Sequence, residues 1–154
     1  MVYLLTYDGY MREGYLEEIC PSAILFMQCG LKDCALEFRR FYETAMPTLE
    51  VGDEIVPAVI WKLEESDLQN MEAIYLNEIY ERAVWNLKTE KGVLEATVFL
   101  MRETPFSLPQ ENELGMMEEA YDEHNFDYSC VENALDRAKD REETYDTLYP
   151  GTDR

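Results

Sequence analysis

Alternating and continuous apolar positions predict several β-strands along the chain. The clearest strands are expected at Val2 to Tyr7, Ile55 to Leu63, Tyr80 to Leu87 and Val93 to Met101. Asp8-Gly9 marks a tight turn after the first of them. Lys91-Gly92 marks a turn between the last two, so these strands are expected to form a hairpin.

Two further strands are predicted nearer the start of the chain. Ala23 to Cys29 and Cys34 to Phe41 are apolar or alternating runs, and Gly30-Leu31-Lys32-Asp33 between them is typical of a turn. These runs therefore predict another hairpin. The segment that follows, Tyr42 to Asp53, is interrupted by a proline and a glycine and is expected to be a loop.

Apolar residues at helical spacing predict four helices. One lies between the two central strands, where Ser66 and Gln69 form a capping box and apolar side chains follow on one face. The others are expected at about Met11 to Ile19, Glu111 to His124 and Tyr128 to Arg141. Beyond them little apolar material remains, which predicts a loose acidic tail over residues 142–154.

Composition adds a strongly acidic surface to this picture. The 154 residues include 33 acidic and 13 basic side chains, which give a formal net charge of -20. Direct binding to nucleic acid or to an acidic membrane is therefore not expected, although the same charge could attract a basic protein partner. No segment has the features of a secretory signal or a membrane span, so a cytoplasmic location is expected.

The cysteines and the histidine give no indication of a metal or another cofactor. The four cysteines form no C-x-x-C pair, and His124 is the single histidine. A zinc site is therefore not expected, and the thiols are expected to be reduced and packed.

Three segments of the sequence resemble one protein family. The run VPAVIWKLEESDLQNMEAIYLNEIYERAVW resembles the core of the gamma-glutamylcyclotransferase-like proteins, in which a strand ending in a Trp-Lys-Leu-like tripeptide leads to a short helix and a Tyr-x-Arg strand. YLLTYDGYM lies where the family has a Tyr-Gly-Ser-Asn loop, and PFSLPQENELGMMEEAYDEHNFDYSCVENAL resembles its Pro/Ser turn and paired terminal helices. The resemblance implies an α+β fold for residues 1–141, with a small mixed or closed, barrel-like β-sheet and flanking helices.

The resemblance also implies a chemistry. A gamma-glutamyl cyclotransferase lets the free α-amine of a γ-glutamyl group attack its own γ-carbonyl, which releases 5-oxoproline and an amine or peptide. A carboxylate must take a proton from the α-amine, and aimed donors must stabilise the developing oxyanion. In the family, a glutamate near the end of the central helix and the Tyr-Gly-Ser-Asn loop have these roles.

The family's loop and binding residues can be placed on this sequence. The expected substrate-binding residues are Tyr7, Asp8, Gly9, Tyr10 and Tyr80. Only the first tyrosine of the loop matches the family. Asp8 and Tyr10 are expected to narrow the cavity or to put a charge beside it. Four tyrosines, Tyr7, Tyr10, Tyr75 and Tyr80, are expected to converge on one cavity whose aromatic walls suit a small ligand.

The family's catalytic glutamate aligns with Tyr75. A tyrosine with an ordinary pKa near ~10 is protonated at neutral pH and accepts an ammonium proton poorly. Glu72, one helical turn earlier, and Glu78, after the helix, could supply a replacement base. Arg82, in the Tyr-x-Arg strand, is expected to form a structural ion pair.

Three hypotheses about function follow. The leading one is a gamma-glutamylcyclotransferase-like protein with a degenerate active site, a pseudoenzyme that serves as a small-molecule-binding or protein-interaction module. The second is an active gamma-glutamyl cyclotransferase that binds a γ-glutamyl compound and uses Glu72 or Glu78 as the base. The third is an acidic protein that imitates nucleic-acid charge and inhibits a basic protein.

Overall fold

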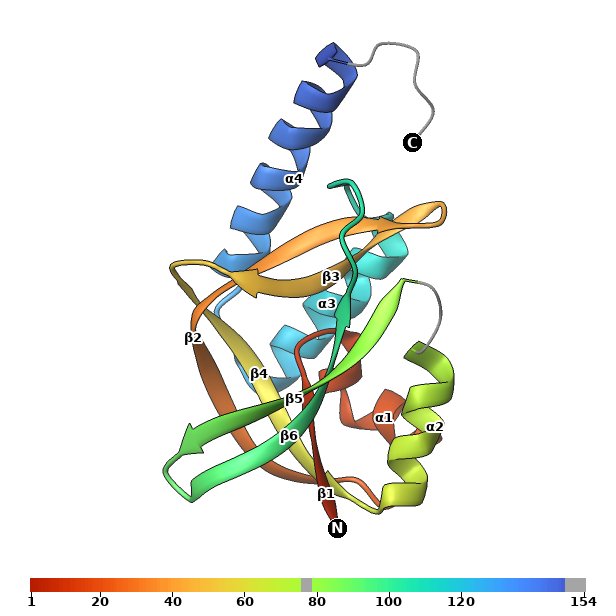
Figure 1. Ribbon diagram of the computed structural model, residues 1–154, viewed down its shortest axis with the longest axis vertical. Helices are drawn as coiled ribbons and strands as arrows, with labels where there is room; N and C mark the ends of the chain where they lie inside the picture. The colour runs from red at the N-terminus through yellow and green to blue at the C-terminus, as the bar shows by residue number, and fades with distance from the viewer. Residues whose placement is uncertain (76–78, 149–154) are drawn as a thin grey trace.

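A six-stranded mixed β-sheet forms the centre of the molecule (Figure 1). The structure is a computed structural model that describes residues 1–75 and 79–148, with side chains as far as residue 142. Its strands are β1 (Val2–Thr6), β2 (Ile24–Phe41), β3 (Thr44–Val51), β4 (Glu54–Leu63), β5 (Tyr80–Thr89) and β6 (Gly92–Met101). In space they follow the order β3-β2-β4-β1-β6-β5, in which β1 and β6 run parallel and the other neighbours antiparallel. The sheet curls into a half-barrel, in agreement with the mixed or barrel-like sheet that the family resemblance implies.

β2 is one continuous strand, so the hairpin predicted around Gly30-Leu31-Lys32-Asp33 is wrong. The strand pairs with β4 through residues 24–31 and with β3 through residues 34–41. Between these stretches the register shifts, and Asp33 has a left-handed φ of 57°. A short polar residue tolerates this conformation. The chain therefore forms a bulge and changes its pairing partner where a turn was expected.

The loop predicted at residues 42–53 is also wrong, because most of it forms β3. The chain reverses at Tyr42, which has a left-handed φ of 54°, and β3 then runs back along β2. Pro47 fits in this strand because β3 is at the edge of the sheet and needs no N–H donor on its open side.

The remaining predicted strands are confirmed, and they hold the core together. Trp61 of β4 is fully buried, and its indole N–H donates a 2.8 Å hydrogen bond to the hydroxyl of Thr6 in β1. That hydroxyl donates in turn to the carbonyl of Val59 at 3.3 Å. The predicted hairpin is formed by β5 and β6, which pair along their whole length.

Four α-helices and one short 3-10 helix accompany the sheet in the described part of the chain. They are η1 (Gly9–Met11), α1 (Glu13–Ile19), α2 (Glu65–Tyr75), α3 (Glu111–His124) and α4 (Ser129–Leu148). α1 begins later than predicted because Asp8 caps the 3-10 turn that precedes it. α2 begins at Glu65, so Ser66 lies inside the helix and is not its N-cap as predicted.

α4 continues past Arg141 to Leu148, so residues 142–148 are helical where a loose tail was predicted. Arginine and glutamate have high helix propensities, which favour continuation of the helix. In Figure 1 this end of α4 extends beyond the sheet. Residues 149–154 lie outside the described residues. None of the described helices is long and apolar enough to cross a membrane.

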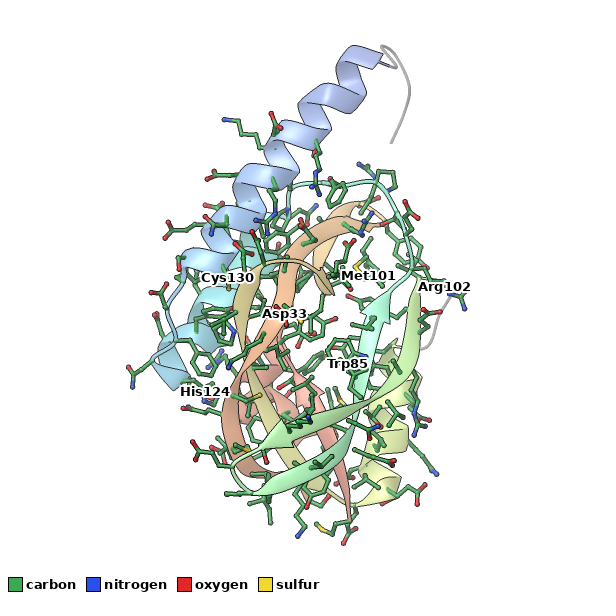
Figure 2. All side chains as sticks on the ribbon, turned by 60° about the vertical axis from the view of Figure 1, so that its left-hand side comes forward. Asp33, Trp85, Met101, Arg102, His124 and Cys130 are labelled. Atoms are coloured by element: carbon green, nitrogen blue, oxygen red, sulfur yellow. The ribbon has the colours of Figure 1, made fainter. Side chains whose placement is uncertain are left out.

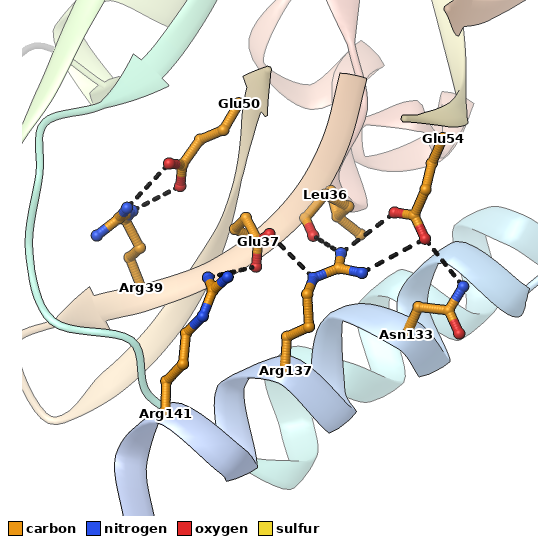
Figure 3. A network of polar contacts seen from close by, with 8 residues as sticks. All are labelled: Leu36, Glu37, Arg39, Glu50, Glu54, Asn133, Arg137 and Arg141. Carbon is orange, nitrogen blue, oxygen red and sulfur yellow. Dashed lines mark hydrogen bonds and ion pairs between the residues drawn. The ribbon is translucent and has the colours of Figure 1, made fainter. Parts of the chain in front are cut away.

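A polar network fastens α4 to β2 and β4 (Figure 3). The guanidinium of Arg137 donates to the carboxylate of Glu37 at 3.0 Å and to the carbonyl of Leu36 at 2.8 Å. It also donates to the carboxylate of Glu54 at 3.2 Å, and Arg141 lies 3.8 Å from Glu37. The helix is therefore held by charge-assisted bonds as well as by its apolar face.

The other helices gather at the end of β1. α1 and α3 both pack on η1, and α2 contacts β1 and β5. The turn after β1, the C-terminal end of α2 and the first turns of α3 therefore surround one region of the molecule.

Candidate functional site

The turn after β1 is built around the carboxylate of Asp8. This side chain is 4% exposed and accepts a 3.0 Å hydrogen bond from the backbone N–H of Tyr10, which caps η1. The N–H groups of Met11 and Arg12 bond to the carbonyls of Asp8 and Gly9. The backbone donors of residues 10–12 in this turn are therefore all engaged within it.

Tyr75, the last residue of α2, reaches this turn. Its phenol donates a hydrogen bond to the second carboxylate oxygen of Asp8. Its ring stacks on Phe99 of β6, with centroids 4.7 Å apart and planes inclined by 6°. Tyr80 and Tyr10 meet the same ring edge-on at 5.0 Å and 5.7 Å.

The four tyrosines expected to converge are thus close together in the structure. The remaining one, Tyr7, donates a 2.5 Å hydrogen bond to the carbonyl of Phe99, the residue on which Tyr75 stacks. The rings fill the space between them, because the cavity bounded by Tyr7, Asp8, Tyr75 and Phe99 is about 10 Å³. A water molecule needs roughly 10–15 Å³ of such space. The aromatic residues therefore form a packed cluster here.

An open cavity of about 220 Å³ lies on the other side of Asp8, between η1, β3 and α3. Its wall includes the carboxyl side chains of Asp8 and Glu113, the ring of Tyr10 and several thioethers; the main lining residues are Asp8, Gly9, Tyr10, Met46, Glu113 and Met116. Gly9 allows the close approach of α3, since a Cβ at this position would lie 3.3 Å from the Met116 side chain. Asp8 thus borders both the packed cluster and the open cavity.

Burial determines the electrostatics of the Asp8–Tyr75 pair. Loss of hydration raises the pKa of the Asp8 carboxyl above its ordinary value, while the hydrogen bonds from Tyr75 and Tyr10 act in the opposite direction. Burial, followed by the nearby charge of Asp8, raises the pKa of the Tyr75 phenol. Tyr75 therefore remains a protonated donor at neutral pH.

Of the two acids that the sequence offers as a replacement base, Glu72 is not placed at this centre. Glu72 forms an ion pair with Arg82 of β5, the structural ion pair that was expected of this arginine. Glu72 lines neither of the two spaces beside Asp8. Glu78 lies outside the described residues.

Several residues around Asp8 were missed by the sequence analysis. Phe99 could have been found from the hairpin register, because it pairs with Arg82 of the Tyr-x-Arg strand. Met46 lies in a segment predicted to be a loop, and Glu113 and Met116 lie on a helix with no local signal for this contact.

The described residues contain no group of three or more histidine, cysteine, aspartate or glutamate side chains that could hold a metal ion. The side chain of His124 joins elements of the fold. Its imidazole bonds to the carbonyl of Met11 at 2.6 Å and to the side chain of Gln28 at 3.0 Å, so it links α3 to η1 and β2.

Comparison with known proteins relates this arrangement to a known fold. No protein-family model matches the sequence, and no curated protein matches it. Among solved structures, a gamma-glutamyl cyclotransferase is similar with a TM-score of 0.71 and 17% identity, over 86% of this chain and 85% of that chain. An uncharacterized protein from Homo sapiens gives a TM-score of 0.68 and 18% identity over 79% of each chain. YkqA from Bacillus subtilis gives 0.62 and 14%, over 79% of this chain and 48% of its own.

These similarities establish the fold. The chain has the mixed half-barrel α+β fold of gamma-glutamyl cyclotransferase, in agreement with the expectation from the sequence.

Proposed function

We propose that the chain is a divergent gamma-glutamylcyclotransferase-like protein that binds a small cationic molecule and no longer performs cyclotransfer. One observation carries the proposal: the phenol of Tyr75 is hydrogen-bonded to Asp8 at the position where the resemblance puts the catalytic glutamate. A carboxylate on α2 is thereby replaced by a donor.

The residues around Asp8 and Tyr75 are poorly suited to the chemistry of cyclotransfer. The reaction needs a base for the substrate ammonium group, whereas the Tyr75 phenol has a raised pKa and donates a hydrogen bond to Asp8. It also needs free donors for the oxyanion, whereas the N–H of Tyr10 is bound to Asp8. The cavity of about 10 Å³ beside the Tyr75 ring leaves no room for a γ-glutamyl group.

The open cavity beside Asp8 supports a binding role. At about 220 Å³ it suits a compound smaller than a typical drug-sized ligand. Two carboxyl groups, Asp8 and Glu113, favour an ammonium group, and the Tyr10 ring offers a cation–π contact. A small amine is therefore the class of ligand that we expect.

The experiment measures turnover and binding on the same samples. 5-Oxoproline release is assayed with a panel of γ-glutamyl peptides and amines, and binding of free amines is measured by calorimetry. Wild type should release no 5-oxoproline and should bind amines, with binding weakened in Asp8→Asn and Glu113→Gln. Turnover by wild type would overturn the proposal.

A second candidate function is a working cyclotransferase that uses Asp8 as its base. The observation that favours it is the buried carboxyl of Asp8, with a raised pKa, in the wall of the open cavity. In that case wild type releases 5-oxoproline, Asp8→Asn abolishes the release and Tyr75→Phe does not. Glu72→Gln and Glu78→Gln are assayed in parallel, because loss of turnover in one of them would instead identify a base supplied by α2 or by the residues after it.

A further inference from the structure

A larger cavity lies between the β5–β6 hairpin and the strands β2 and β4. Its volume is about 440 Å³, within the roughly 300–1,000 Å³ of typical small-molecule sites. β2 contributes Leu31 and β4 contributes Ile60, while Trp85 and Leu87 come from β5. Figure 2 shows Trp85 between the hairpin and the opposite strands. The body of the cavity is therefore apolar.

This cavity is separate from the tyrosine cluster. Tyr80 begins β5 and packs on Tyr75, whereas Trp85 and Leu87 lie farther along the same strand. The five residue-to-residue steps of extended strand from Tyr80 to Trp85 span roughly 17 Å. None of the residues that line the cavity borders either space beside Asp8.

The charges around the cavity differ from those of the rest of the molecule. The chain carries 33 acidic residues, yet no carboxyl side chain is among the described residues that line this cavity. Lys32 and Lys88 do line it, and both are exposed to solvent. Within the described part of the chain neither ammonium group has a carboxylate within ion-pair distance.

Charge complementarity therefore indicates which class of ligand fits this cavity. Apolar walls favour a hydrocarbon or aromatic body, and two lysines without carboxylate partners favour an anionic group at the mouth. A cationic ligand would meet like charge here, in contrast to the cavity beside Asp8.

We propose that the cavity between the β5–β6 hairpin and strands β2 and β4 binds a small amphipathic anion, with its apolar body against Trp85 and its acidic group at Lys32 and Lys88. The site is independent of the one that we propose beside Asp8, so either can fail without the other.

The test compares three probes with the same chain and different head groups: decanoate, 1-decanol and decylammonium. Binding is measured by calorimetry below the micellar concentration and by tryptophan fluorescence. The chain has two tryptophans, and Trp61 is fully buried in the core whereas Trp85 lines the cavity. Decanoate should bind with one-to-one stoichiometry, should alter the fluorescence and should lose that signal in Trp85→Phe.

Two variants locate the site. Lys32→Gln/Lys88→Gln should weaken decanoate binding roughly five- to tenfold, the effect of losing two partly exposed charge contacts. Leu87→Asp puts a like charge into the apolar wall and should abolish the binding.

Each variant has a matched control. Lys62→Gln/Lys139→Gln removes the same charge away from the cavity, and Val84→Asp adds a carboxylate at a residue of the same strand that is 54% exposed and does not line the cavity. Both controls should bind decanoate like wild type. The proposal is overturned if decanoate binds no better than decylammonium, or if Leu87→Asp and Val84→Asp bind it equally well.

Discussion

The phenol of Tyr75 donates a hydrogen bond to the carboxylate of Asp8, and both side chains are buried. The bond ties the C-terminal end of α2 to the turn after β1. A buried carboxylate requires donors, and here it has two, from Tyr75 and from the backbone N–H of Tyr10. Each of these two buried polar groups therefore supplies the hydrogen-bond partner that the other needs.

Removing the Tyr75 hydroxyl should destabilise the protein. Tyr75→Phe keeps the ring on Phe99 but leaves one oxygen of Asp8 without its donor. The expected loss in the free energy of unfolding is about 1–3 kcal/mol. The pKa of Asp8 should also rise further, because the bond to Tyr75 lowers it. Urea denaturation at pH 7 and at pH 4 measures both effects, and the loss should be smaller at pH 4.

The control for this change is Tyr42→Phe. Tyr42 is 64% exposed, so removal of its hydroxyl should alter the free energy of unfolding by less than about 0.5 kcal/mol. Equal losses in the free energy of unfolding for the two variants at pH 7 would show that the Tyr75–Asp8 hydrogen bond does not stabilise the protein.

Asp8→Asn should change the dependence of stability on pH. Folding raises the pKa of Asp8, so its favourable contribution is complete below the unfolded pKa of about 3.9 and is lost as the pH rises through the folded pKa. The unfolding free energy of wild type minus that of Asp8→Asn should therefore fall as the pH rises from about 4 toward neutrality. A difference of one pKa unit corresponds to about 1.4 kcal/mol. A flat difference across this range would contradict the raised pKa.

Restoring the family's residues should test whether the scaffold can still support cyclotransfer. Tyr75→Glu alone would set a second carboxylate against Asp8, because the two side chains touch. The double variant Asp8→Gly/Tyr75→Glu avoids this repulsion and restores both family residues. We expect detectable 5-oxoproline release from the double variant and none from Tyr75→Glu. The double variant's far-ultraviolet circular dichroism checks that it is folded, and a folded but silent protein would mean that further positions block the reaction.

Arg137 should be the most important residue for the attachment of α4. Burial raises the pKa of Glu37, and Arg137 is the largest factor that opposes this rise. Arg137→Ala leaves Arg141, at 3.8 Å, as the remaining arginine beside Glu37. The expected loss in the free energy of unfolding is roughly 2–3 kcal/mol, less than for a fully buried pair because Arg137 is partly exposed. Lys139→Ala, an exposed change on the same helix, is the control and should cost little. Similar urea midpoints for the two variants would contradict this role.

Gly52 should be far less replaceable than Gly14. A Cβ at Gly52 would lie 2.5 Å from the Cβ of Ala35 and 3.1 Å from its backbone nitrogen, where the chain passes from β3 to β4 beside β2. Gly52→Ala should therefore cost about 1–3 kcal/mol. Nothing lies within 4 Å of a Cβ at Gly14 in α1, so Gly14→Ala should stabilise the helix by about 0.5–1 kcal/mol. Thermal melting of both variants shows directly whether each change lowers or raises the stability of the protein.

Local patterns in the sequence are enough to predict several elements of the fold. β1, β4, the β5–β6 hairpin and α3 follow from apolar periodicity and turn residues that lie within each segment. The resemblance of a few short segments then indicated the fold and directed attention to Asp8, Tyr75 and their neighbours.

Contacts between distant segments set the points at which strands change pairing partners and the side chains that meet. β2 leaves β4 for β3 at a bulge around Asp33, and no local pattern separates such a bulge from a turn, because both favour a short polar residue with positive φ. The bond between Tyr75 and Asp8 joins residues from different elements. The cavity beside Trp85 depends on how the hairpin curls over β2 and β4. Such contacts arise from the packing of distant segments, which periodicity and composition do not encode.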